Sequence, residues 1–314
     1  MVVRAASRPI FGRRLADFNC FLTFSRFSAN YILTYSNTSK ETEMNNEIGI
    51  AGWLYSPEIL REKKMALLEL PAACAAHGLS TVELCSAFFA SQKADYLNEL
   101  RSSLEDNGLT VHNIAVDMAN LAGTDQKTRR TDIEALRQWF YTATAVGSRA
   151  IRINSGHAED AEAMRRVVDG YRELVETASQ AGVKLLMENH GGVSSYSNKL
   201  AEILNGVDSE WFGTCPDTGN FFDDDWEAGM RVLAPRAFSC HLKIFSLNAD
   251  SLQSWIDRNG QERNCNLKES LQILKSAGYG GPFCLEQEAV SESAPKEQNI
   301  SDTITFITDL IRSA

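Results

Sequence analysis

Two hydrophobic periods alternate along residues 47–314. Short apolar runs bounded by chain-breaking residues, which are typical of buried strands, are separated by longer amphipathic stretches with the period of a helix. The predicted strands cover residues 48–53, 79–84, 110–117, 149–154, 183–188, 211–217, 237–243 and 282–286. The predicted helices cover residues 57–77, 92–107, 128–146, 159–181, 197–205, 225–234, 266–277 and 297–312, with a longer loop over 246–264. This succession of strand–helix units predicts an α/β protein with a parallel sheet.

The helix exits and the chain length favour closure of this sheet into a single (β/α)8 barrel. Gly108, Gly147 and Gly182 follow predicted helices, at positions where glycine commonly ends a helix. A barrel of about 250 residues would use most of the chain. The alternative is an open doubly wound sheet, but no GxGxxG motif follows the first strand to support it.

Four predicted strands end in side chains that can bind a metal ion. Glu188, Asp217, His241 and Glu286 stand at or near the ends of the last four strands. In a parallel barrel the C-terminal ends of the strands meet at one face, where active sites lie. Side chains also alternate along a strand, and this alternation puts His241 and Glu286 on the interior side. We therefore predict that the four side chains form one site.

Three carboxylates and one imidazole make a hard, oxygen-rich ligand set. It suits Mn²⁺ or Mg²⁺, with Co²⁺ or Zn²⁺ as alternatives. A divalent cation held there can polarise a carbonyl and stabilise the enediolate that forms when a neighbouring C–H bond loses its proton. Glu188 and Glu286 are then candidates for an acid/base pair that acts from opposite faces of a substrate.

Further side chains are candidates for contact with a substrate, and each also has a purely structural interpretation. Lys243 could pair with a carboxylate, Trp53 could belong to an apolar wall, and the residues after Glu188 could simply turn the chain. The polar residues on interior faces could form salt bridges within the barrel. These candidates are Trp53, Glu83, Arg152, Asn154, His190, Asn220 and Lys243.

The sequence resembles the xylose isomerase-like TIM barrels, specifically the sugar phosphate isomerase/epimerase group. The resemblance spans about 47–314 and implies that Glu188, Asp217, His241 and Glu286 are the metal ligands, and that Glu188 and Glu286 transfer protons. Ketose 3-epimerases of this group commonly place a histidine where this chain has Asn220. The matching segments are Val82-Glu83-Leu84, Glu188-Asn189-His190-Gly191-Gly192, Pro216-Asp217-Thr218-Gly219-Asn220-Phe221, Cys240-His241-Leu242-Lys243 and Leu285-Glu286.

The resemblance implies a metal-dependent isomerase that interconverts sugars or sugar acids, in the aldose–ketose isomerase or ketose epimerase class. One alternative is a metal-dependent lyase of the 3-dehydroshikimate dehydratase type. Another is a barrel that binds a sugar, or serves as a subunit, without turnover. Members of the group often dimerise, so a homo-oligomer remains open.

Composition argues against nucleic acids and membranes as partners. The net charge is −10, and a surface that acidic repels a phosphate backbone. The barrel endonucleases for abasic DNA use a histidine at the position of Asn220 and several more for a three-metal cluster. The five histidines here, with His77 and His157 on or beside predicted helices, cannot assemble that cluster. No apolar run is long enough to span a bilayer, so no membrane partner is expected.

Residues 1–43 differ from the rest of the chain. They are rich in Arg, Ser and Phe and poor in acidic residues, which is typical of a mitochondrial transit peptide. The alternatives are a disordered tail or an over-called start, with translation beginning at Met44. We treat 1–43 as a non-core extension and 47–314 as the barrel. Seven cysteines without CxxC spacing favour a reducing compartment, the cytoplasm, or the mitochondrion if the extension is a transit peptide.

Overall fold

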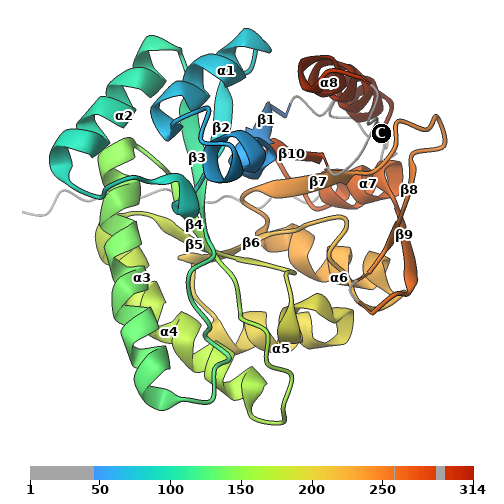
Figure 1. Cartoon of the computed structure of the whole chain (residues 1–314). Helices are drawn as coiled ribbons and strands as arrows, with labels where there is room; N and C mark the ends of the chain where they lie inside the picture. Colours follow the sequence, from blue (N-terminus) through green and yellow to red (C-terminus); the bar gives the residue numbers. More distant parts are fainter. Residues whose placement is uncertain (1–45, 258, 288–293) are drawn as a thin grey trace, which may run out of the picture. The chain divides into compact units, whose positions relative to one another are not determined.

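Eight parallel strands form one sheet in the computed structural model, which describes residues 46–257, 259–287 and 294–314 (Figure 1). The predicted extension over 1–43 lies outside these residues. The strand order is β6-β5-β4-β3-β2-β1-β10-β7, with neighbours hydrogen-bonded. The strands are β1 (Ile48–Ala51), β2 (Thr81–Cys85), β3 (Thr110–Val116), β4 (Ala150–Ile153), β5 (Lys184–Glu188), β6 (Phe212–Cys215), β7 (Cys240–Ile244) and β10 (Phe283–Gln287).

The two strands at the ends of this order also meet, so the sheet curls into a barrel. Parallel bridges join Thr214 to Ala237 and Asp217 to His241, which links the end of β6 to β7. The predicted (β/α)8 barrel is confirmed. The bridge at Asp217 also brings two of the predicted metal ligands side by side.

Helices follow the strands and cover the outside of the barrel (Figure 1). Glycines in the left-handed conformation, Gly147 and Gly182, end α3 and α4 as predicted. The α-helices are α1 (Leu70–Ala76), α2 (Ala94–Asp106), α3 (Gln126–Val146), α4 (Ala163–Ala181), α5 (Ser197–Val207), α6 (Trp226–Leu233), α7 (Leu267–Ser276) and α8 (Lys296–Ser313). None of the described helices is long and apolar enough to cross a membrane.

The prediction of one continuous helix over 57–77 is wrong. The structure breaks it into η2 (Pro57–Arg61), η3 (Leu67–Glu69) and α1, and Lys63 between them has φ 54°. Pro71 explains part of the break, because its ring and missing N–H are tolerated only in the first turn of a helix. The structure places Pro71 in the first turn of α1.

The prediction of a plain loop over 246–264 is also wrong. This segment holds an antiparallel hairpin of β8 (Leu252–Ile256) and β9 (Glu262–Asn266). The buried Gln253 fixes the hairpin to the end of β7, since its side chain accepts from the backbone N–H groups of Phe245 and Ser246 at 2.8 and 2.9 Å. The sequence shows little strand-like alternation of apolar residues here, because polar residues such as Gln253 hold the hairpin in place.

Candidate active site

His241 is the centre of the predicted metal site. Its Nδ1 lies 3.3 Å from Oε1 of Glu188, 3.7 Å from Oδ2 of Asp217 and 3.5 Å from Oε1 of Glu286. The imidazole, Glu188 and Asp217 are all buried, and the Glu286 side chain is 13% exposed. The structure therefore brings together all four side chains that the strand ends predict.

Hydrogen bonds with Asn189 and Gly219 fix the position of Asp217, which lies between β6 and β7. The side chain of Asn189, just after β5, donates to the backbone carbonyl of Asp217 and accepts from its N–H, both at 2.8 Å. The N–H of Gly219 donates to Oδ1 of Asp217 at 2.6 Å. Oδ2 has no hydrogen-bond partner within the described part of the chain and is the oxygen that faces His241.

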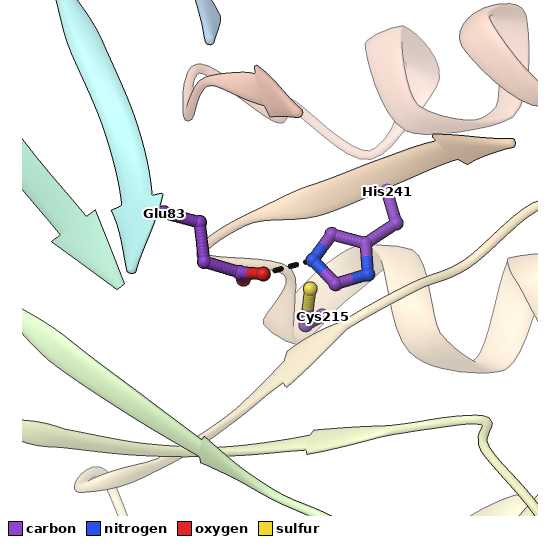
Figure 2. Close-up of side chains that lie close together, drawn as sticks. All are labelled: Glu83, Cys215 and His241. Atoms are coloured by element: carbon purple, nitrogen blue, oxygen red, sulfur yellow. Dashed lines mark hydrogen bonds and ion pairs between the residues drawn. The ribbon is translucent and has the colours of Figure 1, made fainter. Parts of the chain in front are cut away.

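The other ring nitrogen of His241 contacts a different carboxylate. Nε2 lies 2.8 Å from Oε2 of Glu83 on β2, and Figure 2 shows this carboxylate pointing at the ring beside Cys215. Asn113 is paired with Glu83 in the strand register and donates to the same oxygen at 2.6 Å. Because that oxygen is an acceptor, the facing Nε2 carries a proton, and Nδ1 is left to act as a metal ligand.

The charges around His241 fit a bound cation. Burial raises the pKa of the Asp217 carboxyl. Burial disfavours the charged form of the His241 ring, but the carboxylates of Glu83, Glu286 and Glu188 outweigh burial and raise its pKa well above the ordinary value. Three carboxylates thus draw positive charge to one buried point, and their oxygens are the donors that Mn²⁺ and Mg²⁺ prefer.

A second group of possible ligands shares His241 with the first. Ligand atoms of Glu83, Cys215 and His241 lie within 4.8 Å of one another, as do those of Glu188, Asp217 and His241. Burial raises the pKa of the Cys215 thiol, so this group lacks the thiolate that a soft metal requires. The oxygen-rich group is the better cation site.

Each of the two predicted proton-transfer residues has a cationic neighbour. Nζ of Lys243 lies 2.9 Å from Oε2 of Glu286, its register partner on β10. Nε of Arg152 lies 2.9 Å from Oε2 of Glu188, without the alignment of a hydrogen bond. Asn220 donates to Oε1 of Glu188 at 3.0 Å and accepts from Lys243 at 3.2 Å, so it bridges the two sides.

These cations decide the protonation of both glutamates. Burial alone would raise the pKa of Glu188, but Arg152 and His241 outweigh it and hold the pKa well below the ordinary value. For Glu286 burial is likewise outweighed by Lys243 and His241, and its pKa is lowered. Both side chains are therefore ionised at neutral pH.

A cavity of about 660 Å³ opens beside the cluster at the strand ends. Glu286 reaches its wall, whereas Glu188, Asp217 and Asn220 are not among the lining residues. Six of the seven predicted substrate contacts do line it, namely Trp53, Glu83, Arg152, Asn154, His190 and Lys243.

Several residues of the cavity wall are not among the predicted site residues. Asp117, Met118, Trp139 and His157 also line it. Asp117 follows β3 directly, so the rule that selected Glu188 could have found it. Arg152 Nη1 pairs with Asp117 and donates to Oδ1 of Asn154 at 2.8 Å. Arg152 thus forms a salt bridge of the kind that the structural interpretation predicts, and it also lines the cavity.

Comparisons with known proteins agree with this arrangement. A family model described as xylose isomerase-like TIM barrel matches residues 71–310. L-ribulose-5-phosphate 3-epimerase UlaE of Escherichia coli (strain K12) is 28% identical over 188 residues, which cover 56% of this chain and 62% of that enzyme. The chain thus matches less than two thirds of that relative.

Solved structures of sugar epimerases share the fold. D-psicose 3-epimerase from Clostridium cellulolyticum H10, with D-tagatose, superposes with a TM-score of 0.67 at 15% identity and covers 85% of this chain and 99% of its own. 3-Keto-D-glucoside 4-epimerase YcjR from E. coli gives a TM-score of 0.63 at 13% identity, with 84% and 99% covered. At these identities the similarity establishes the barrel.

Proposed function

The chain belongs to the xylose isomerase-like TIM barrel family, and from this membership we propose that it is a divalent-metal-dependent sugar epimerase or isomerase. The observation that carries the proposal is the meeting of three carboxylates at Nδ1 of His241. The epimerases among its relatives act on a phosphorylated ketose, a free ketose and a keto-glucoside. What these substrates share is a C–H bond next to a carbonyl group.

Glu188, Asp217, His241 and Glu286 would hold the ion, with Mn²⁺ or Mg²⁺ suited to this oxygen-rich set. When bound, the ion would neutralise the carboxylates and polarise the substrate carbonyl. Glu83 orients the His241 ring through Nε2.

We assign the proton transfer to the two glutamates. Glu286 lines the cavity and is held ionised beside Lys243, as a general base must be. It removes the proton next to the carbonyl, and the electron pair of that C–H bond moves into an enediolate. Glu188, which is ionised at rest, first takes up a proton from solvent and then delivers it to the other face, which restores the C–H bond with inverted configuration. The proton on Glu286 is released to solvent, and the reverse reaction exchanges these roles.

The structure favours this reaction over a lyase that acts on a sugar acid. Such a lyase needs a cation for the carboxylate of its substrate, and Arg152 is the arginine that lines the cavity among the described residues. Arg152 is instead paired with Asp117 and faces Glu188. A substrate carboxylate would have to compete with both of these groups.

Solvent proton exchange tests the proposal. Purified protein is analysed for bound metal, supplied with Mn²⁺ and incubated in heavy water with ketoses, keto-glycosides and dehydroshikimate, and deuterium uptake is followed by proton NMR. We expect uptake next to the carbonyl of a sugar, and a loss of about 10²–10⁴-fold in Glu188→Gln and Glu286→Gln. Glu202→Gln, an exposed change on α5, is the control. Metal binding without exchange in any compound would leave a sugar-binding barrel and refute the enzyme.

The six described cysteines are free and buried, consistent with the reducing compartment that the sequence predicts. We propose the cytoplasm as its location, or the mitochondrion if residues 1–43 are a transit peptide.

A further inference from the structure

The cavity has two chemically different sides. Its polar side is built on β2, β4, β7 and β10, from Glu83, Arg152, Lys243 and Glu286. Its apolar residues come from the end of β2 and from the segments that follow β1, β2 and β3, which are neighbours in the barrel, together with α3; Ser86 and Asp117 of these segments line the cavity too. We call these apolar residues the apolar wall, and they are Trp53, Cys85, Ala87, Met118, Ala119 and Trp139.

The apolar wall keeps large side chains open to solvent. Trp53 is 49% exposed and Met118 is 55% exposed, although both are apolar. Phe88 stacks on Trp53 with 6.2 Å between ring centroids and 6° between planes, so the indole is held flat with one face covered. Trp139 donates from Nε1 to Sδ of Met118 at 2.9 Å. A fixed, exposed apolar surface of this kind marks a binding site.

The cavity is also larger than one sugar ring needs. Its volume of about 660 Å³ lies in the range of roughly 300–1,000 Å³ in which drug-sized ligands bind. A single monosaccharide is much smaller than such a ligand. When the reacting carbon lies at Glu286 on the polar side, the apolar wall is left for a second part of the same molecule.

The charges of the cavity argue against a phosphorylated substrate. Among the described residues, Arg152 and Lys243 are the lysine and arginine side chains that line it. Arg152 is paired with Asp117 and Glu188, and Lys243 with Glu286 and Asp217. A phosphate group at Arg152 would meet Asp117, which is not among the predicted metal ligands, whereas phosphate sites normally offer unopposed arginine, lysine or helix N-termini.

We infer that the substrate is an uncharged keto-sugar that carries an apolar, preferably aromatic, substituent, as a keto-glycoside does. The sugar lies on the polar side and the substituent stacks on Trp53 and packs on Met118. This inference rests on the proposed function for the reaction at the sugar, and on the apolar wall for the rest of the molecule.

Binding of stable glycosides tests it without turnover. The full-length protein with Mn²⁺ is titrated calorimetrically with the phenyl and methyl glycosides of glucose, galactose and mannose, and with glucose 6-phosphate. For at least one sugar we expect the phenyl glycoside to bind about tenfold or more tightly than the methyl glycoside, because the ring is buried and stacked. Glucose 6-phosphate should bind more weakly than that phenyl glycoside.

Variants locate the contact. Trp53→Ala should remove most of the preference for phenyl, while Trp53→Phe should retain part of it. Tyr141→Ala, which removes an aromatic side chain that is 57% exposed but not part of the cavity wall, should change neither affinity. Equal affinity for phenyl and methyl glycosides, including no measurable binding of either, or tighter binding of the phosphate, overturns the inference.

The outcome is separable from that of the proposed function. If ketoses epimerise but the preference for phenyl is absent, the inference on substrate class is wrong and the epimerase stands. If the preference is present but no carbonyl compound exchanges a proton, the apolar wall is a binding site and the epimerase is wrong.

Discussion

Nε2 of His241 lies 2.8 Å from Oε2 of Glu83, while Nδ1 of the same ring faces the carboxylates of the predicted metal site. This contact crosses from β7 to β2, and Glu83 is itself held by Asn113 on the neighbouring β3. Glu83 therefore holds the His241 ring in one orientation from the side opposite the predicted metal site. In such an arrangement the outer carboxylate fixes the tautomer and strengthens the metal ligand.

We predict that Glu83→Gln weakens Mn²⁺ binding by about 10–100-fold, because the ring loses its anionic partner. Calorimetric titration of metal-free protein with Mn²⁺ measures the change. The matched control is Glu202→Gln, which removes an exposed carboxylate on α5 and should bind Mn²⁺ as the wild type does. Unchanged affinity in Glu83→Gln would show that the contact has no part in metal binding.

Asp217→Asn should separate metal binding from folding. Burial raises the pKa of Asp217, so its charge is unfavourable without a cation, and the variant should be at least as stable as wild type when metal is removed. Asparagine can still accept from Gly219 through Oδ1. With Mn²⁺ at about 100 times its Kd the wild type should gain about 2.7 kcal/mol, and the variant should gain much less.

Thermal or chemical unfolding with and without Mn²⁺ measures this difference. Asp250→Asn, in the segment before β8, is the control for loss of an aspartate outside the site. An equal gain in wild type and Asp217→Asn would exclude Asp217 as a ligand.

Gly192→Ala should destabilise the protein more than an alanine at another left-handed glycine. Gly192 has φ +53°, and a Cβ there would lie 2.4 Å from the carbonyl oxygen of Gly156. Gly182 has φ +67° with open space around it, so Gly182→Ala reports the backbone cost alone, about 1–2 kcal/mol. The excess in Gly192→Ala is the cost of displacing the segment at Gly156.

Urea unfolding of both variants gives the comparison. Because Gly156 lines the cavity, Gly192→Ala should also lower proton exchange, whereas Gly182→Ala should leave it unchanged. Equal destabilisation by the two variants would contradict the steric argument.

A buried histidine away from the site should make stability depend on pH. Burial lowers the pKa of His112 to about 3. Its Nδ1 lies 3.0 Å from Oγ1 of Thr81, and its Nε2 lies 2.7 Å from Sγ of Cys284. Burial keeps the pKa of the Cys284 thiol high, so the thiol keeps its proton and the ring stays neutral.

The folded pKa of His112 is below that of the unfolded chain, about 6.5. The stability that it contributes is therefore complete above about pH 6.5 and is lost as the pH falls towards 3, by about 1.4 kcal/mol per pH unit. Chemical unfolding at pH 7 and pH 5 should show a smaller loss in His112→Gln than in wild type. The same pH slope in both proteins would exclude His112 as its source.

The sequence predicts that Glu188, Asp217, His241 and Glu286 lie close together, because their convergence depends on two periodic rules. Alternation along each strand puts His241 and Glu286 inside, and the parallel barrel brings the strand ends to one face. The same rules apply to Asp117, which follows β3 directly and could have been included in the predicted site. Trp139 could not be found in this way, because it reaches the cavity from α3 through tertiary packing.

Other features depend on contacts that no local pattern encodes. The hairpin β8–β9 is tied to the barrel by Gln253, and Arg263 joins it to Asp257 and Asp224 at 3.0 and 2.7 Å. Polar residues of this kind are typical of loops in a sequence. Arg152 is predicted to contact a substrate, but it pairs with Asp117. This pairing likewise depends on how closely β3 and β4 approach each other.

The pairing of β1 with β10 has a consequence for folding during synthesis of the protein. Gly49 lies beside Cys284 in the register, so the ring is closed by strands from opposite ends of the barrel sequence. Translation delivers β10 last, and Glu286 with it. A ribosome that stalls before this strand releases a chain with the unpaired edges of β1 and β7 exposed, which invites aggregation. Closure of the ring and the meeting of Glu286 with the other three predicted ligands thus both depend on β10.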